Sequence, residues 1–439
     1  MEKITFDLKK KNGRFKVMNA VNNGPCHRRH STSQLRSNLV AFREARIPYA
    51  RTHDSSFENY YGSEHTVDIS AIFPDFDADP YDPSSYDFAV TDEYIMVTLE
   101  ANTEPFYRLG QRIEHYIKKF NTLPPKDFHK WAVVCEHIIR HYNEGWADGY
   151  QLGIQYWEIW NEPDMNRDES LDKKTWGGTK KQFFEFYEIA AKHLKSCFPE
   201  LKIGGPALAN RLNWADDFLA LMNEKNVPLD FFSWHIYCTT PEQMLELAEK
   251  VKALLVKHGY GDIESILNEW NYVKGWGEEY IDSIKTVIGM KGAAFTMACM
   301  SAAQHSSIDM LMYYDARPCV LNGLFDFYTW EPLKGYYPFK WYGKFYDMSA
   351  EVVSENEVSD IYTLCGVDDE EKVLAVITYY TDEEGKEDKT VTVDFGRNGE
   401  YEIFLLDESH DAELIQVTSD LTFTLTPNSC LMIQERKAE

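Results

Sequence analysis

Two Asn-Glu dipeptides follow strand-like apolar runs and place carboxylates where they could act on a bond. The first, Asn161-Glu162, lies in the run Y-W-E-I-W-N-E-P-D (156–164); the second, Asn268-Glu269, lies in S-I-L-N-E-W-N (265–271). Two carboxyls at different strand ends can divide the work of cleaving a glycosidic bond, one donating a proton and the other attacking the anomeric carbon. Helix capping or ion pairing is the competing explanation for each glutamate.

The dipeptide alone is not specific, because this acidic chain contains five of them. The other three, at 143–144, 223–224 and 356–357, follow helical or acidic sequence. Only the two singled out here follow strand-like runs and are flanked by tryptophan, Trp160 and Trp270. Their context therefore favours a shared site on one face of a sheet.

Between residues 15 and 350, repeated strand and helix patterns predict the sheet whose face would carry these two dipeptides. Eight short apolar runs are expected as strands: 15–21, 47–52, 105–109, 154–160, 203–207, 231–237, 265–268 and 310–314. Helices are expected at 34–45, 85–99, 127–142, 180–197, 214–225, 241–258 and 279–304. Eight such units predict an α/β fold, a (β/α)8 TIM barrel with its active site at the carboxyl ends of the strands.

The sequence pattern changes after residue 350. Residues 351–439 show period-two strands separated by turn-rich segments, which predicts a C-terminal antiparallel β-sandwich domain. Residues 1–14 contain a strand with the same alternation, and we expect it as a candidate additional strand of that sandwich.

Charge and composition narrow the function classes. The chain has 439 residues, 44% of them hydrophobic, and a formal net charge of −26, which opposes binding to nucleic acid or to anionic membranes. There is no apolar run near 18 residues and no signal-peptide pattern at the start, so we expect a cytoplasmic protein. Eight cysteines without any C-x-x-C spacing are consistent with reduced, packed thiols.

The stretch W-E-I-W-N-E-P (157–163) resembles the acid/base motif of clan A glycoside hydrolases, and especially of glycoside hydrolase family 39, which is known for β-xylosidases and α-L-iduronidases. The resemblance covers roughly residues 15–350 and also implies the trailing sandwich. Further stretches match in the same order: Gly24-Pro25, Arg51-Thr52-His53, His235-Ile236-Tyr237 and Asn268-Glu269-Trp270.

The resemblance implies a role for each reacting group. Glu162 would be the general acid/base and Glu269 the nucleophile. Asn161 would bind the sugar 2-hydroxyl. Arg51 would hold Glu269 ionised, and Tyr237 would donate a second hydrogen bond to it.

Other residues are candidates for the walls of the sugar subsite. The resemblance implies that His53 and His235 line it, with a satisfied core histidine as the alternative for each. Trp330 is the candidate aromatic platform after the eighth strand, with a core tryptophan as the alternative. Glu158 has the same strand parity as Glu162, so we expect it to point into the barrel and to pair with an arginine.

Three segments leave the identity of the substrate sugar undetermined. The cluster C-H-R-R-H (26–30) is either solvated charge or a site for a carboxylate or several hydroxyls, and it fits no standard zinc site. The loops 56–82 and 315–331 differ from those we associate with the xylosidases.

The expectation is therefore a retaining, exo-acting glycoside hydrolase that acts on short oligosaccharides or glycosides and needs no metal or organic cofactor. A pentose-specific enzyme, β-xylosidase-like or arabinoside-cleaving, comes first. The alternatives are a uronic-acid glycosidase of the iduronidase type, a non-catalytic sugar-binding barrel, and a structural protein without sugar response. Oligomeric state is left open.

Overall fold

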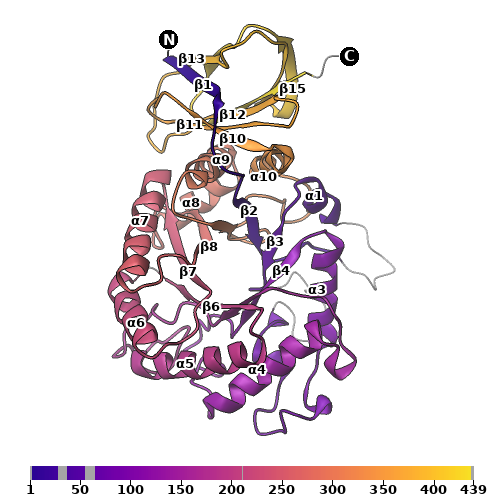
Figure 1. Cartoon of the computed structure of the whole chain (residues 1–439), viewed down its shortest axis with the longest axis vertical. Coiled ribbons are helices and arrows are strands. Elements are labelled where there is room, and N and C mark those ends of the chain that lie inside the picture. The colour runs from indigo at the N-terminus through magenta and orange to yellow at the C-terminus, as the bar shows by residue number, and fades with distance from the viewer. Residues whose placement is uncertain (1, 28–36, 55–64, 210, 437–439) are drawn as a thin grey trace.

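The computed structural model describes residues 2–27, 37–54, 65–209 and 211–436. Eight parallel strands close into a barrel in chain order, with helices around it (Figure 1). The strands are β2 (Val17–Asn22), β3 (Tyr49–Arg51), β4 (Glu104–Leu109), β5 (Tyr156–Ile159), β6 (Lys202–Leu208), β7 (Phe231–Cys238), β8 (Glu264–Tyr272) and β9 (Met310–Tyr313). The predicted (β/α)8 barrel is confirmed.

The helices lie on the outside of this barrel and bury one face against it. They are α1 (Leu39–Glu44), the single turn α2 (Ile69–Ile72), α3 (Ala89–Glu100), α4 (Phe128–Asn143), α5 (Lys180–Cys197), α6 (Leu212–Glu224), α7 (Pro241–Lys257), α8 (Tyr280–Val287), α9 (Met290–Gln304) and α10 (Tyr336–Lys344). Short 3₁₀ turns cover Pro83–Ser85, Trp146–Asp148 and Phe345–Asp347.

The expectation of one helix over 279–304 is wrong, because the chain forms two helices there that meet at 77°. Gly289 precedes the first turn of α9 in an extended conformation, so the helix does not continue through it. A Cβ at Gly292 would lie 2.6 Å from the backbone oxygens of Thr286 and Val287. The break therefore needs a residue without a side chain where α9 turns back against the end of α8.

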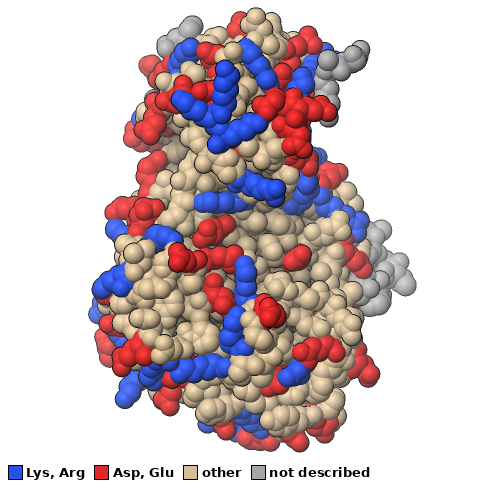
Figure 2. Space-filling model, in the orientation of Figure 1, with Lys and Arg blue, Asp and Glu red and all other residues tan. Residues whose placement is uncertain are grey.

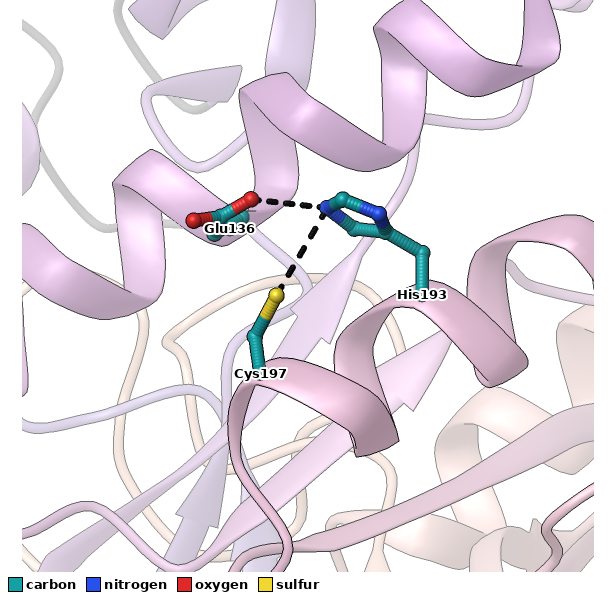
Figure 3. Close-up of side chains that lie close together, drawn as sticks. All are labelled: Glu136, His193 and Cys197. Atoms are coloured by element: carbon teal, nitrogen blue, oxygen red, sulfur yellow. Dashed lines mark hydrogen bonds and ion pairs between the residues drawn. The ribbon is translucent and has the colours of Figure 1, made fainter.

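Neighbouring outer helices are joined by polar contacts as well as by apolar packing. Thr179 and Gln182 form a capping box at the start of α5. Toward the other end of α5, His193 Nε2 lies 2.7 Å from Glu136 Oε2 on α4 and 3.9 Å from Cys197 Sγ (Figure 3). The His193–Glu136 contact joins α4 to α5, the two helices that flank β5.

The barrel interior is apolar at one end and charged at the other. An apolar cluster comes mainly from the first halves of the strands: Ala20, Phe106, Tyr156, Phe231, Ile266, Met310 and Met312. Toward the carboxyl ends, the fully buried side chains include Arg51, Glu158 and Asn268. The barrel is thus a packed core with a polar layer at the end where active sites form.

The C-terminal part forms a nine-stranded, mostly antiparallel sheet that encloses a second core. Its order is β15 (Asp411–Thr418), β14 (Tyr401–Leu406), β17 (Ser429–Glu435), β12 (Val373–Tyr379), β11 (Ile361–Val367), β10 (Ala350–Ser354), β1 (Glu2–Lys11), β13 (Lys389–Asp394) and β16 (Thr422–Leu425). The N-terminal strand β1 pairs antiparallel with β10 and parallel with β13.

α9 lies between the barrel and this sheet (Figure 1) and is buried on nearly every side. Leu364, Val376 and Met432, from three strands of the sheet, belong to the same apolar cluster as the barrel core. A helix that is hydrophobic all round is expected only where it is covered all round. The two domains therefore share a continuous apolar contact.

Acidic and basic side chains are interleaved over the face of the molecule in Figure 2, on both the barrel and the sheet domain. Among the helices of the described ranges, none is by itself long and apolar enough to cross a membrane; α8 and α9 meet that test only when counted together across their bend.

Candidate active site

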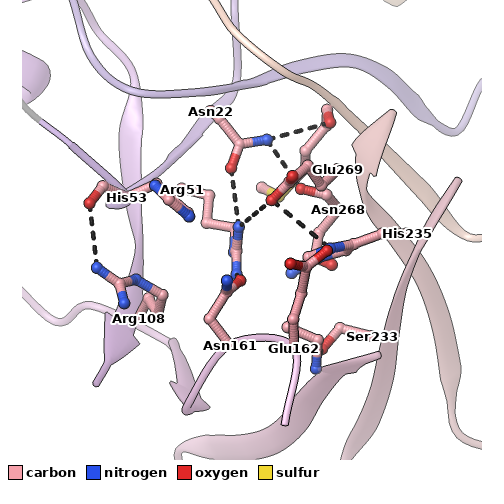
Figure 4. Close-up of polar contacts among 12 residues, drawn as sticks. Asn22, Arg51, His53, Arg108, Asn161, Glu162, Ser233, His235, Asn268 and Glu269 are labelled. Carbon is pink, nitrogen blue, oxygen red and sulfur yellow. Dashed lines mark hydrogen bonds and ion pairs between the residues drawn. The ribbon is translucent and has the colours of Figure 1, made fainter. Parts of the chain in front are cut away.

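Six of the eight predicted site residues meet at the carboxyl ends of four barrel strands, and Figure 4 labels all of them except Tyr237. β3 contributes one of them, the β5 end two, β7 two and β8 one. They are Arg51, Asn161, Glu162, His235, Tyr237 and Glu269.

Glu162 is held in a tight turn that follows β5. Its backbone N–H donates to Ala207 O (2.8 Å), and its own carbonyl accepts from the Thr175 hydroxyl (2.6 Å). Trp160 and Glu162 both adopt positive φ, 75° and 47°, which is strained for residues with a Cβ. On the neighbouring strand, Gly205 has a φ of 141°, which only glycine adopts readily, and a Cβ there would lie 2.9 Å from the backbone oxygen of Ile159, just before this turn.

The Glu162 carboxyl is almost entirely removed from solvent, with 5% of the residue exposed. Burial raises its pKa to about 7, and Arg51 opposes that shift only in part. At neutral pH a large share of Glu162 is therefore protonated, as a proton donor requires.

Glu269 lies within β8 and is surrounded by groups that favour its charged form. Tyr237 donates a hydrogen bond to Oε1 (2.6 Å), and Arg51 Nη1 lies 3.3 Å from Oε2. Burial and the nearby Glu162 raise the pKa of Glu269 above its ordinary value, and Arg51 and the Tyr237 hydroxyl oppose that shift. Because these partners act on Glu269 directly, we assign the negative charge of the pair to Glu269.

His235 lies between the two carboxyls. Its Nδ1 is 2.9 Å from Glu162 Oε1 and 3.6 Å from Glu269 Oε2 (Figure 4). Burial lowers the pKa of His235, so the ring is neutral at neutral pH. It orients both carboxyls without adding a full positive charge.

Arg51 is fully buried and uses its guanidinium on four partners. Nε donates to Glu158 (2.6 Å), Nη1 to Asn22 (3.0 Å) and Glu269, and Nη2 to Asn161 Oδ1 (2.7 Å). The predicted inward orientation of Glu158 and its pairing with an arginine are confirmed. The other carboxylate oxygen of Glu158 accepts hydrogen bonds from the Ser233 hydroxyl and the Asn268 amide.

Asn161 is left with a free donor. Its Oδ1 is bound to Arg51, which fixes the amide, and its buried Nδ2 has no hydrogen-bond partner among the described residues. A buried amide N–H without a partner is costly, and a hydroxyl of a bound sugar would satisfy it.

His53 lies beside this group rather than within it. Its Nδ1 is 3.1 Å from Asp54, and burial lowers its pKa to about 3, so it is neutral. Its ring packs edge-on against Tyr314, with ring centroids 5.4 Å apart. Nε2 is buried without a partner within the described part of the chain, so it remains available as a polar contact.

A cavity of about 720 Å³ opens above Glu162 and Glu269, and its aromatic wall was not predicted from the sequence. Trp276, Tyr280 and Tyr314 line it together with Tyr237. The Trp276 ring is 62% exposed, stacks on Tyr280 (5.6 Å) and meets Tyr237 edge-on (4.9 Å). Its place seven residues after Glu269, in the loop beyond β8, is the signal that would have found it.

Trp330, the predicted platform, is 9% exposed and is not among the described residues that line this cavity. Its role as a platform stays a prediction. Within the 26–30 cluster, Arg28, Arg29 and His30 lie outside the described residues, as do residues 56–64 of the first divergent loop.

Two groups of side chains have the atom types of metal ligands. In each group, Glu162–His235–Glu269 and Glu136–His193–Cys197, the ligand atoms lie within 4.8 Å of one another. An arginine already faces each group, Arg51 at 3.3 Å from Glu269 and Arg140 at 2.8 Å from Glu136. In each group, the arginine already supplies the positive charge that a metal ion would otherwise supply to the carboxylates.

The barrel and the paired glutamates define a TIM-barrel protein with a two-carboxylate site at the strand ends. The family model of Glycosyl hydrolases family 39 matches residues 4–274, more than half of the chain. The chain belongs to glycosyl hydrolases family 39.

Curated relatives match the chain over less than half its length. The "Beta-xylosidase" of Caldicellulosiruptor saccharolyticus is 30% identical over 211 residues, and that of Geobacillus stearothermophilus is 28% identical over 216. These stretches cover 43% and 42% of this chain and 41% of each relative. The matched stretch thus spans about two fifths of each relative.

Solved structures share the fold over the whole chain at low sequence identity. A glucosidase from Croceicoccus marinus superimposes with a TM-score of 0.79 and 21% identity, covering 100% of both chains. A monomeric beta-xylosidase from Caulobacter crescentus CB15 gives 0.73 and 15%, covering 99% of both. A GH51 alpha-L-arabinofuranosidase from Thermotoga petrophila RKU-1 gives 0.68 and 13%, covering 99% of this chain and 100% of that one.

Proposed function

We propose that this protein is a retaining, exo-acting glycosidase that cleaves short oligosaccharides or glycosides by double displacement. Glu162 acts as the general acid/base and Glu269 as the nucleophile. The main support is the unequal surroundings of the two carboxyls: burial raises the pKa of Glu162 to about 7, whereas Arg51 and Tyr237 bind Glu269 in its charged form.

The spacing of the carboxyls supports retention. One oxygen of Glu162 and one of Glu269 lie within 4.8 Å of each other. Retaining glycosidases hold their carboxyl groups about 5 to 5.5 Å apart, whereas inverting enzymes leave about 6.5 to 9.5 Å for a water molecule.

In the first step, Glu269 attacks the anomeric carbon while Glu162 gives its proton to the glycosidic oxygen. The bond between that carbon and oxygen breaks, the leaving group departs as an alcohol, and the sugar is esterified to Glu269. In the second step, Glu162, now a carboxylate, takes a proton from water, whose oxygen attacks the same carbon and releases Glu269. The free Nδ2 of Asn161 would bind the 2-hydroxyl throughout.

For the sugar we propose a pentose, as in a β-xylosidase or an arabinoside-cleaving enzyme. Support comes from relatives and fold neighbours whose names are β-xylosidase and α-L-arabinofuranosidase. We also propose a cytoplasmic location, which is compatible with eight free cysteines.

Trapping the covalent intermediate tests this proposal. The protein is incubated with 2,4-dinitrophenyl 2-fluoro glycosides of pentosyl, hexosyl and uronosyl type, and intact mass and peptide mapping are then measured. An adduct on Glu269 with a pentosyl mass is expected. Because the activated leaving group needs no proton, Glu162→Gln should still be labelled, whereas Glu269→Gln should not.

The other outcomes are distinct. A uronosyl adduct would show that the substrate sugar is a uronic acid and not a pentose. Hydrolysis with inversion of the anomeric centre, followed by NMR, would contradict double displacement. Binding of a sugar without turnover of any donor would identify a non-catalytic barrel.

A further inference from the structure

The wall of the cavity beside Glu162 carries positive charge in a protein whose net charge is −26. Lys174 and Arg211 line it, with His115 next to them. Among the described residues that line the cavity, Glu162 and Glu269 are the only carboxylates. The two cations thus share the cavity with two carboxylates, of which Glu269 is already paired with Arg51.

Lys174 is placed beside the acid by the backbone. The hydroxyl of Thr175, the next residue, donates to the carbonyl of Glu162 (2.6 Å). The carbonyl of Lys174 accepts from the N–H of Glu114 (2.9 Å), which brings the neighbouring His115 to the same wall. These contacts hold Lys174 beside Glu162, although Lys174 lies toward the far end of the loop between β5 and α5.

Arg211 reaches the same wall from the loop between β6 and α6. Its backbone N–H donates to the buried Asp164 (3.0 Å), and its Nη2 donates to the carbonyl of Met165 (3.1 Å). Asp164 and Met165 come two and three residues after Glu162. The partner of the Arg211 guanidinium here is thus a main-chain oxygen and not a carboxylate.

The charge of Lys174 is only weakly matched. Asp172 lies 3.9 Å from its Nζ, but that carboxylate is 57% exposed and hydrogen-bonded to Lys119 at 2.7 Å. Exposed pairs of this length contribute little.

Neither cation serves the catalytic acid as a charge partner. Within the described part of the chain, Arg51 is the charged group that lowers the pKa of Glu162. An ammonium or guanidinium close to that carboxyl would favour its ionised form and weaken it as a proton donor. The two cations thus line the cavity with Glu162 without acting as its charge partners.

The general acid marks the side of the cavity on which the leaving group departs, because its proton goes to the oxygen of that group. On the strength of the function proposed above, we propose that Lys174 and Arg211 form a leaving-group subsite for a carboxylate. The guanidinium can bind a carboxylate with two parallel hydrogen bonds, and the ammonium adds a point charge. The carboxylate would belong either to a uronic-acid sugar or to an aromatic acid.

Paired leaving groups that differ only in charge test this subsite. One pair is the 4-carboxyphenyl glycoside and its methyl ester; the other is a disaccharide with a uronate as the leaving sugar and the methyl ester of that uronate. The ratio of kcat/KM for acid over ester is measured in the wild type, Lys174→Met, Arg211→Met and the double variant. Differences in leaving-group acidity cancel when ratios are compared between variants.

We expect the ratio to fall about 5- to 10-fold in each single variant and further in the double variant, with the ester rate nearly unchanged. Raising the salt concentration should lower the ratio in the wild type. Lys174→Arg should retain most of the ratio, whereas Arg211→Lys keeps the charge but loses the paired hydrogen bonds and should retain only part of it. Lys250→Met, which removes an exposed lysine on α7 that is 52% exposed, is the charge-matched control and should leave the ratio unchanged. A loss confined to one pair identifies the source of the carboxylate.

Ratios that agree within twofold across all variants would overturn the subsite. Calorimetric titration of the Glu162→Gln protein with the same pairs gives an independent measurement, since it needs no turnover. A preference for the acid that is lost in Glu162→Gln/Lys174→Met supports the subsite even if no glycoside is hydrolysed. Equal affinity for acid and ester, or binding of neither, overturns it.

Discussion

Arg51 and Glu158 lie 107 positions apart in the chain and form a 2.6 Å ion pair in the centre of the barrel, with neither side chain exposed. Because Glu158 takes Nε, the two terminal nitrogens of Arg51 are left for Glu269 and Asn161. The pair therefore orients the cation that both the nucleophile and the substrate-binding amide depend on.

Arg51→Met should destabilise the protein by about 3 to 5 kcal/mol, because it leaves the Glu158 charge buried without a partner. The free energy of unfolding in urea at pH 7 measures this. The double variant Arg51→Met/Glu158→Gln should recover part of the loss. Arg436→Met, which breaks a pair at the surface, should cost less than about 1 kcal/mol. A similar small loss in Arg51→Met would contradict the assigned role of the pair.

The kcat/KM of the enzyme should fall as pH rises through about 7, since Glu162 then loses the proton it must donate. A pH profile on a substrate with a poor leaving group measures this limb. The same profile on a 2,4-dinitrophenyl glycoside should lack the limb in its first step, because that leaving group departs without a proton. An identical alkaline limb for both substrates would argue against Glu162 as the acid.

Glu162 should also make stability depend on pH. Its pKa is about 7 in the folded protein and 4.5 ordinarily, so its stabilising contribution is present below pH 4.5 and lost as pH rises to 7. Glu162→Gln carries no charge and should be more stable than the wild type by about 3 kcal/mol at pH 8, with little difference at pH 4. Thermal unfolding at the two pH values checks this, and the exposed Glu384→Gln serves as the control.

Tyr237→Phe removes the hydroxyl that donates to Glu269 at 2.6 Å. That bond lowers the pKa of Glu269, so its loss should move the acidic limb of kcat/KM to higher pH. A hydrogen bond to a charged group is worth about 1.5 to 3 kcal/mol, which predicts about a 10- to 100-fold loss of kcat/KM. Tyr280→Phe, in the same cavity, should leave the limb in place. An unmoved limb in Tyr237→Phe would contradict this role.

Trp276→Ala should raise KM about 5- to 10-fold, because it removes an exposed ring from the cavity wall. Trp276→Phe should restore most of the affinity. Trp330→Phe compares the two candidate platforms: an effect on KM there, without one in Trp276→Ala, would assign the platform to Trp330. Steady-state kinetics on one glycoside suffices for all three variants.

The sequence by itself determined the barrel, the sheet domain and the two catalytic candidates. These features are local: period-two and apolar runs specify strands, and a polar residue at the end of such a run must face the carboxyl end of the barrel. Glu162 and Glu269 could be found in this way because each comes late in, or just after, an apolar strand-like run, whereas Arg51 and Tyr237 were predicted from the resemblance to a known family.

Only the tertiary structure decided how these groups meet. That His235 bridges both glutamates, that Glu158 rather than Glu269 takes the shortest bond of Arg51, and that Lys174 faces the cavity from the end of a long loop all depend on how the strands stagger and how the loops fold back. Such relations are set by contacts between residues far apart in the chain, and local pattern does not encode those distances.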